Sequence, residues 1–251
     1  MSAWLFLHSV MFLATSANAG DFTVNPGTVQ VGLFFNGADI RVTAEVPAGT
    51  GVAVEISGRE NPVNLKKKGK VLGLLWMNVG DVKIEHAPES YLLESSSELN
   101  KLAQTDELIR LDMGRPGLHD KLLANGEPAD KALFREFFKL KASGGLYAIH
   151  QGRLNLEKTK NPSMEKVTAI FHLPAKIPLG NHQIRVIDFN NGHGEVIYSG
   201  SLAVEKVGLA RWITHVAYNH GLLYGISAVV IALIVGLITG YLFSLGSKGA
   251  H

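Results

Sequence analysis

The chain has 251 residues, which allows one domain of ordinary size with short attachments. It contains no cysteine, so disulfides, zinc–thiolate sites, iron–sulfur clusters and thiol nucleophiles are excluded. Its 24 basic and 22 acidic residues leave a net charge of +2, too small for the broad basic surface of a nucleic-acid-binding protein. Hydrophobic residues make up 46% of the chain and charged residues 18%. We therefore expect a folded protein with no nucleic-acid partner.

Residues 1–19 are predicted to be a secretory signal peptide. Residues 4–13 are apolar, and Ala17 and Ala19 place small side chains at the third and first positions before a cut that leaves Gly20 as the new terminus. The apolar stretch is too short for a membrane span. The pattern therefore indicates export of the domain that follows, residues 20–206, into the periplasm.

Residues 221–245 are predicted to form a transmembrane helix. They carry no formal charge, and 25 helical residues reach about 37 Å, enough to cross a bilayer with some tilt. Aromatic residues lie near both ends, as is typical of membrane interfaces: Trp212, Tyr218, Tyr224, Tyr241 and Phe243. The alternative is a buried helix of a soluble core. The favoured topology is single-pass, with residues 207–220 next to the membrane and residues 246–251 in the cytoplasm.

Small residues recur every four positions in this span, which favours close helix packing. Because lipid is as apolar as leucine, a small-residue stripe lets two backbones gain contacts that bulky side chains would prevent. The stripe comprises Ala228, Ala232, Gly236, Gly240 and Ser244. It predicts an interface with a second copy or with another membrane protein. The alternative is that glycine and alanine are simply common in membrane helices.

Between the two ends, apolar residues mostly alternate with polar ones, as in half-buried strands. The alternating positions lie within residues 29–35, 40–46, 52–56, 167–173, 184–186, 196–198 and 202–204. Turn residues at 25–27, 36–37, 47–49 and 190–192 separate them and favour antiparallel neighbours. The apolar run at residues 71–76 is predicted to be a fully buried strand, followed by another at residues 79–84.

The middle of the domain has a helical period instead. Ser95 and Glu98 resemble a capping box that opens a helix, which Gly114 and Pro116 are expected to end. After Pro128, apolar residues at spacings of three and four predict a second amphipathic helix that ends at 144–145. We therefore predict an immunoglobulin-like antiparallel β-sandwich with a helical insertion at about residues 94–145. The insertion either lies over the sandwich or docks a partner.

Two groups of side chains could carry chemistry or contacts. His172, His182, Asp188 and His193 could bind zinc or copper, but their spacing lacks the i, i+4 pair of a helical zinc site and favours surface histidines. A basic run, Lys66, Lys67, Lys68 and Lys70, is typical of a solvated loop and could also contact anionic lipid or an acidic partner. No nucleophile elbow, P-loop, HExxH or dinucleotide motif occurs in the sequence. We assign no catalytic residue and no cofactor.

Several short segments, in order along nearly the whole mature chain, resemble those of a family of uncharacterised transmembrane proteins of alpha-proteobacteria and some other proteobacteria. They are LFFNGADI at 33–40, GLLWMN at 73–78, APESY at 87–91, LP at 173–174, IPLG at 177–180, VEKVGL at 204–209 and LLYG at 222–225. The charged helical middle is longer here than in that family. The resemblance implies the same topology and a location in the bacterial inner membrane, and it transfers no site residue.

The sequence therefore favours a membrane-anchored periplasmic accessory protein that partners another inner-membrane protein, such as a transporter, with no catalysis expected. A different class is also open: a tethered module that binds a ligand or metal, or a hydrolase with weak sequence signals. Its site would be the face of the histidines or a cleft between sandwich and insertion. The third alternative is a purely structural envelope protein.

Overall fold

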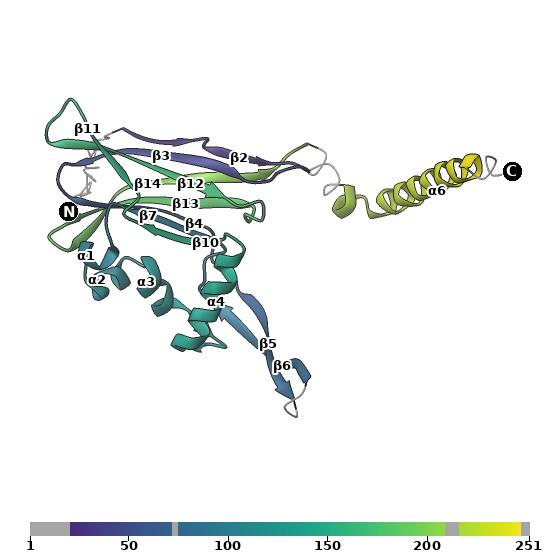
Figure 1. The fold of residues 1–251 in the computed structure, drawn as a ribbon, viewed down its shortest axis with the longest axis horizontal. Helices are drawn as coiled ribbons and strands as arrows, with labels where there is room; N and C mark the ends of the chain where they lie inside the picture. The colour runs from purple at the N-terminus through teal and green to yellow at the C-terminus, as the bar shows by residue number, and fades with distance from the viewer. Residues whose placement is uncertain (1–20, 72–74, 209–215, 247–251) are drawn as a thin grey trace, which may run out of the picture.

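A computed structural model describes residues 21–71, 75–208 and 216–246 of the chain (Figure 1). The predicted signal peptide lies outside these residues. The mainly β fold with a helical insertion and one C-terminal apolar helix is confirmed. The first half of the domain contains β1 (Phe22–Asn25), β2 (Thr28–Val31), β3 (Ala38–Pro47), β4 (Gly51–Ser57), β5 (Val63–Val71), β6 (Leu75–Glu85) and β7 (Tyr91–Ser95). The second half contains β10 (Tyr147–Gln151), β11 (Asn155–Lys158), β12 (Met164–Leu173), β13 (Gly180–Asn190) and β14 (His193–Lys206).

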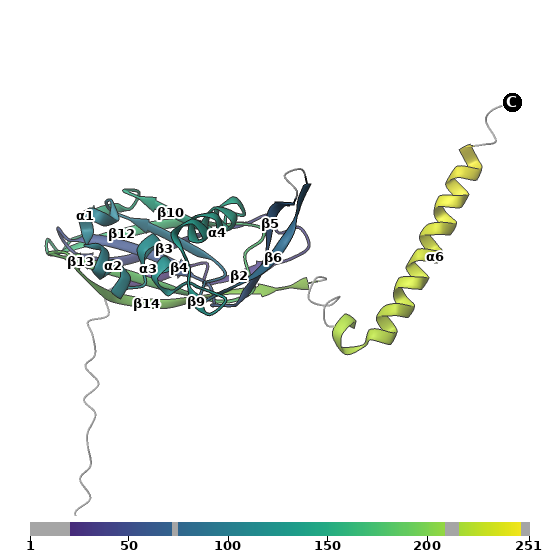
Figure 2. The same ribbon diagram turned by 90° about the horizontal axis from the view of Figure 1, so that it is seen from below.

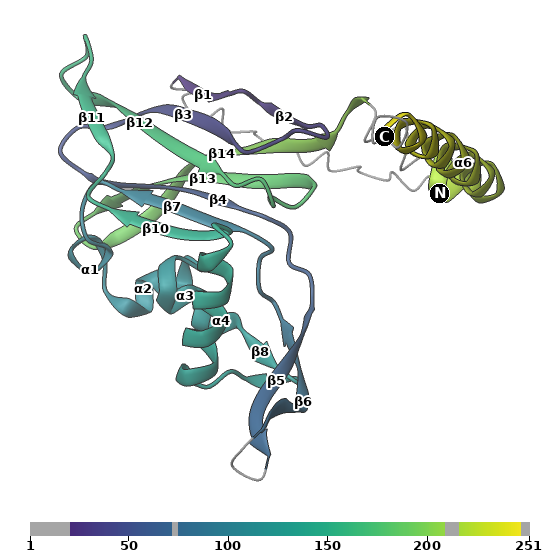
Figure 3. The same ribbon diagram turned by 45° about the vertical axis from the view of Figure 1, so that its right-hand side comes forward.

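Two sheets face each other and enclose the first hydrophobic core. One has the strand order β1-β3-β12-β11 and the other β10-β7-β4-β13-β14-β2 (Figures 1 and 3). The predicted alternation is confirmed in β3, where Ile40, Val42, Ala44 and Val46 are fully buried. Each fully buried aliphatic side chain of this kind contributes about 1.5–3 kcal/mol relative to exposure. The hydrophobic effect on one face of each strand therefore accounts for the sandwich.

Two strand pairs depart from the predicted antiparallel arrangement. β2 pairs in parallel with β14, from Thr28 opposite Ala203 to Val31 opposite Lys206. β10 pairs in parallel with β7, from Tyr147 opposite Tyr91 to Gln151 opposite Ser95. The predicted hairpin at residues 190–192 is confirmed, because Asn190 pairs with His193 across a turn whose central residues both have positive φ.

A second hydrophobic core lies between the outer face of the six-stranded sheet and the helical insertion. Figure 3 shows the helices against the β10, β7, β4 and β13 side of this sheet. β4 is consequently buried on both faces: Val54 and Ile56 pack in the first core, while Ala53 packs in the second. A strand covered on both sides needs no polar alternation.

The insertion contains α1 (Leu99–Leu102), α2 (Thr105–Arg110), α3 (Gly114–Lys121), β8 (Leu123–Ala124), β9 (Glu127–Pro128) and α4 (Lys131–Ser143). The predicted first helix is therefore wrong in detail. Gly114 and Pro116 begin α3 rather than end a helix, because proline is tolerated in the first helical turn. The predicted capping box is also wrong: Ser95 is the last residue of β7, and no side chain caps α1. The predicted second helix is confirmed as α4, whose N-cap Asp130 accepts the Ala132 and Leu133 amides.

The apolar run at residues 71–76 is not one buried strand. β5 and β6 form an antiparallel hairpin in which Val71 pairs with Leu75, and the Leu75 side chain is 66% exposed. Residues 72–74 lie outside the described part. The hairpin belongs to a third sheet of order β5-β6-β8-β9 and projects from the body of the domain (Figures 1 and 2).

The last described element is α6 (Gly221–Gly246), which follows the domain after residues 209–215 that the structure does not describe. Its stretch Tyr224–Tyr241 is apolar and long enough to cross a membrane, and none of that stretch is buried. A helix that is apolar all round and unburied needs lipid or a partner around it.

Candidate functional site

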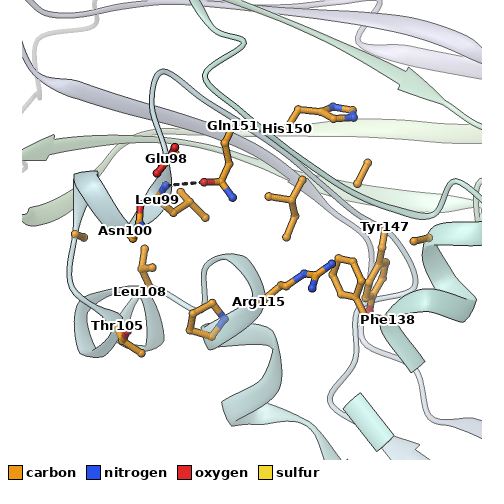
Figure 4. Close-up of a pocket in the computed structure, with 15 residues that line it drawn as sticks. Glu98, Leu99, Asn100, Thr105, Leu108, Arg115, Phe138, Tyr147, His150 and Gln151 are labelled. Carbon is orange, nitrogen blue, oxygen red and sulfur yellow. Dashed lines mark hydrogen bonds between the residues drawn. The ribbon is translucent and has the colours of Figure 1, made fainter. Parts of the chain in front are cut away.

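A groove of about 990 Å³ lies between the sheet edge and the insertion (Figure 4). One wall is β10. The other walls come from all four short helices of the insertion, with Leu99, Leu108, Arg115 and Phe138 among the lining side chains. The predicted insertion thus lies over the sandwich and at the same time leaves an open groove beside it.

The groove is bordered by an open backbone edge, because β10 is the outermost strand of its sheet. The Tyr91 amide donates to the Leu146 carbonyl, so this carbonyl points toward β7. Successive residues of a strand alternate, and the amides and carbonyls of Tyr147, Ile149 and Gln151 therefore point away from β7. These groups can accept and donate hydrogen bonds to a further extended segment.

The floor of the groove is aromatic, with one positive charge above it. The Phe138 and Tyr147 rings meet edge to face with centroids 5.5 Å apart. The Arg115 guanidinium carbon lies 4.3 Å from the Phe138 centroid and extends into the groove (Figure 4). At the other end, the Leu99 amide donates to the Gln151 Oε1 over 2.9 Å, which ties α1 to the sheet edge. The arrangement suits an extended segment that carries apolar side chains and a carboxylate.

A second cavity, of about 340 Å³, is polar and lies at the centre of the junction between sheet and insertion. Glu55 on β4 is 1% exposed and accepts the Arg185 Nε from β13 over 2.6 Å. The Tyr91 hydroxyl donates to the same carboxylate over 2.9 Å, and Arg185 also donates to the Leu111 carbonyl. Burial raises the pKa of Glu55 above its ordinary value, against the lowering influence of Arg185. Arg59 and Lys121 complete the basic part of the lining.

Glu107 joins α2 to the β13–β14 hairpin. Its carboxylate pairs with Arg110 at 2.7 Å, accepts the Gly194 amide at 2.7 Å and lies 2.9 Å from His193. The bond from Arg110, together with that from the Gly194 amide, lowers the pKa of Glu107 to about 2. A Cβ at Gly194 would lie 2.6 Å from the Leu111 Cδ1, so glycine permits this close approach.

The four candidate metal ligands do not lie together. His172 Nδ1 is 2.7 Å from Asp39 on the exposed face of the smaller sheet, and Asp188 accepts from Thr50. His193 pairs with Glu107, as described above. His182 is buried, and its Nε2 and the Ser90 Oγ have no hydrogen-bond partner within the described residues. No group of three or more metal-ligating side chains occurs in residues 21–71, 75–208 and 216–246.

The lysine run and the small-residue stripe occupy two separate elements. Lys66, Lys67, Lys68 and Lys70 lie within the strand β5, not in a loop, and Lys66 pairs with Asp81 at 2.8 Å. Ala228, Ala232, Gly236, Gly240 and Ser244 lie on α6. A Cβ placed on Gly236 or Gly240 would meet no atom within 4 Å.

The sequence analysis considered a cleft between sandwich and insertion, and the groove lies there, but the Glu55 cluster had no counterpart among the sequence predictions. Glu55 occupies an alternating position of β4 at which a polar residue is typical of a solvent-facing site. The only sequence signal for its burial is a second apolar layer, the phenylalanine face of the predicted amphipathic helix, which needs a sheet to cover.

A family model described as "Putative transmembrane protein (Alph_Pro_TM)" matches residues 21–244. The chain belongs to this family. The predicted family membership is thereby confirmed, and the match together with α6 makes the chain a membrane protein. No curated protein and no solved structure matches the chain.

Proposed function

We propose that this chain is a membrane-anchored accessory protein whose exported domain binds another inner-membrane protein, such as a transporter. The observation that carries the proposal is the groove beside β10. An extended segment of the partner adds to the open edge of the six-stranded sheet, with its backbone paired to Tyr147, Ile149 and Gln151. Apolar side chains of that segment contact Phe138 and Tyr147, and an acidic side chain pairs with Arg115.

The membrane helix supports the same proposal. α6 is held in the bilayer, so a partner in that membrane meets the domain at high effective concentration. The small residues of α6 allow a second contact within the bilayer, which adds to the affinity of the groove. The periplasmic location of the domain and the cytoplasmic C-terminus are part of the proposal.

The first experiment is photo-crosslinking in native membranes. A photoreactive amino acid replaces Asn100, an exposed residue at the groove, in the full-length chain. The matched control carries it at Lys160, an exposed residue between β11 and β12. We expect a stoichiometric membrane protein to crosslink at position 100 and not at position 160.

A second pair of variants tests the sheet edge itself. Ile149→Pro removes an amide that points into the groove and leaves the ladder with β7 intact, since proline is tolerated on edge strands. Ile149→Val keeps both the amide and most of the packing. We expect the proline variant to lose the crosslinked complex and the valine variant to keep it, with both variants folded by circular dichroism. Retention of the complex by a folded proline variant would contradict strand addition.

The polar cavity favours a second candidate, a tethered module that binds a small polar ligand. Arg59, Lys121 and Gln183 line this cavity around the buried Glu55. Recovery of the chain alone, under conditions in which a known membrane complex crosslinks, would favour this candidate. Native mass spectrometry of the purified full-length chain would then reveal a bound small molecule.

A further inference from the structure

The chain leaves the domain beside an exposed apolar loop. β14 leads toward α6, and β2 runs parallel to it, with the Val207 amide donating to the Val31 carbonyl over 3.1 Å. Parallel strands end at the same end of a sheet. The loop of residues 32–37, which follows β2, therefore lies beside the segment that leads into the membrane.

This loop presents two large apolar side chains to solvent. Phe34 is 96% exposed and Leu33 is 56% exposed. The alternating pattern had placed both in a strand, but β2 ends at Val31 and neither side chain reaches a core. An exposed phenylalanine beside a half-exposed leucine suits an apolar contact better than water.

The β5–β6 hairpin carries a second exposed apolar surface. Leu75, Met77 and Val79 are 66%, 52% and 50% exposed. Leu75 pairs with Val71 and Met77 with Gly69, so their side chains share one face of the hairpin. Nearer the body, Leu65 and Val82 pair with each other and pack against the second core. On this face, the Lys67–Gly80 pair separates the exposed apolar residues from the pair that packs against the core.

The opposite face of the hairpin is basic. Lys66, Lys68 and Lys70 alternate with the residues of the apolar face, whereas Lys67 lies on the same face as Leu65 and Gly69. Asp81 lies opposite Lys66 and pairs with it. A hairpin with an apolar face and clustered lysines combines the two chemistries of a membrane interface, an acyl region and anionic headgroups.

Both surfaces lie at one end of the domain. Figures 1 and 2 place the β5–β6 hairpin toward the same end of the long axis as the last residues of β14, and Figure 1 shows β11 at the opposite end. Gly221 follows Lys206 by 15 positions, which spans at most about 50 Å of extended chain. The tether thus keeps this end within reach of the membrane.

We propose that this end of the domain docks on the bilayer that α6 crosses. Leu33 and Phe34 insert beside the tether, and Leu75 and Met77 insert at the hairpin, while the lysines contact anionic lipid headgroups. The domain is then held against the membrane in one orientation. This inference concerns lipid and is independent of the protein partner proposed above.

The absence of cysteine makes the test direct. Phe34→Cys, Met77→Cys and the control Lys160→Cys each give the full-length chain a single spin-label site. The labelled chains are reconstituted without other proteins into nanodiscs of phosphatidylethanolamine and phosphatidylglycerol. For each label we compare the collision rate with oxygen to the collision rate with a water-soluble nickel chelate. We expect this ratio to be at least threefold higher at positions 34 and 77 than at position 160.

The opposite outcomes overturn the inference. Labels at 34 and 77 that are as accessible to nickel as the label at 160 would show that neither surface meets lipid. Labels that are aqueous in nanodiscs but protected in native membranes would assign the surface to a protein. Nanodiscs of phosphatidylcholine alone lack anionic headgroups and test the role of the lysines. We expect the label at 77 to become more accessible to the nickel chelate in them. An unchanged accessibility would overturn the role of the lysines.

Discussion

The Tyr91 hydroxyl joins the sheet to the insertion by donating to Glu55 over 2.9 Å while accepting the Gly114 amide over 2.8 Å. Glu55 lies on the central strand β4, and Gly114 begins α3. Burial raises the pKa of Tyr91 well above its ordinary value, so the hydroxyl keeps its proton and remains a donor. One side chain thus positions the helices that form the wall of the groove.

We expect Tyr91→Phe to destabilise the domain by about 1–3 kcal/mol, because it leaves a buried carboxylate oxygen and a buried amide without a partner. Thermal unfolding of the full-length chain in mild detergent measures the effect. Tyr198→Phe is the matched control, since its hydroxyl donates to the Glu45 carbonyl at a partly buried site. Equal losses in the two variants would mean that the Tyr91 bridge has no special role.

The low pKa of Glu107 predicts an acid-dependent loss of stability. Its folded value of about 2 lies below the ordinary value of 4.5, so its contribution is complete above about pH 4.5 and is lost as the pH falls toward 2. The Glu107→Gln variant should be less stable than the unaltered chain near neutral pH. It should also lose less stability than the unaltered chain as the pH falls from about 4.5 toward 2. Melting temperatures from pH 6 to pH 2.5 test this, with Glu157→Gln, an exposed carboxylate on β11, as the control. Parallel curves for the Glu107 variant and the unaltered chain would contradict the assignment.

The sequence predicted the strands of the first core and the amphipathic helix α4, because one-sided burial imposes a period on the residues. It could not predict the Glu55 cluster, which joins positions 55, 91 and 185 through the register of β4 with β7 and β13. It suggested a cleft between sandwich and insertion but could not predict that β10 borders it, because an edge strand is defined by which neighbours are absent from the sheet. The prediction of a buried strand at 71–76 was wrong because an exposed hairpin and a buried strand can share one composition.

Gly117→Ala should destabilise the insertion by about 1–3 kcal/mol. A Cβ there would lie 2.4 Å from the Asp112 carbonyl carbon, and backbone cannot move aside as a side chain can. This clash outweighs the gain in helix propensity of about 1 kcal/mol. Gly32→Ala, whose Cβ would meet nothing within 4 Å, is the control. The comparison is a denaturant titration of both variants, and equal midpoints would show that α3 shifts freely.

Chelation should leave the protein unchanged. His172 and His193 each pair with a different carboxylate, Asp39 and Glu107, on separate elements. We expect no stoichiometric zinc or copper in the purified full-length chain and an unaltered melting temperature after treatment with EDTA. A bound metal that is lost when His172, His182 and His193 are replaced together by alanine would revive the metal-binding alternative.

Replacing Gly236 and Gly240 by leucine should abolish helix association in the membrane. The added side chains would hold a neighbouring backbone away from a stripe that is now open. Val235→Leu with Ile238→Leu changes bulk at positions that already carry large side chains and serves as the control. The readout is the crosslinked complex in native membranes. An unaltered complex in the glycine variant would place the contact entirely in the exported domain.

The pairing of β14 between β13 and β2 determines how the protein responds to mechanical force. A pull on α6 along the axis of β14 enters the domain through a 14-residue strand that is paired with β13 along most of its length and also with β2 at Ala203–Lys206. In that direction the ladder is loaded in shear, so its hydrogen bonds share the force instead of opening one after another. The domain is thereby attached to its membrane tether through the most force-resistant geometry that a sheet offers.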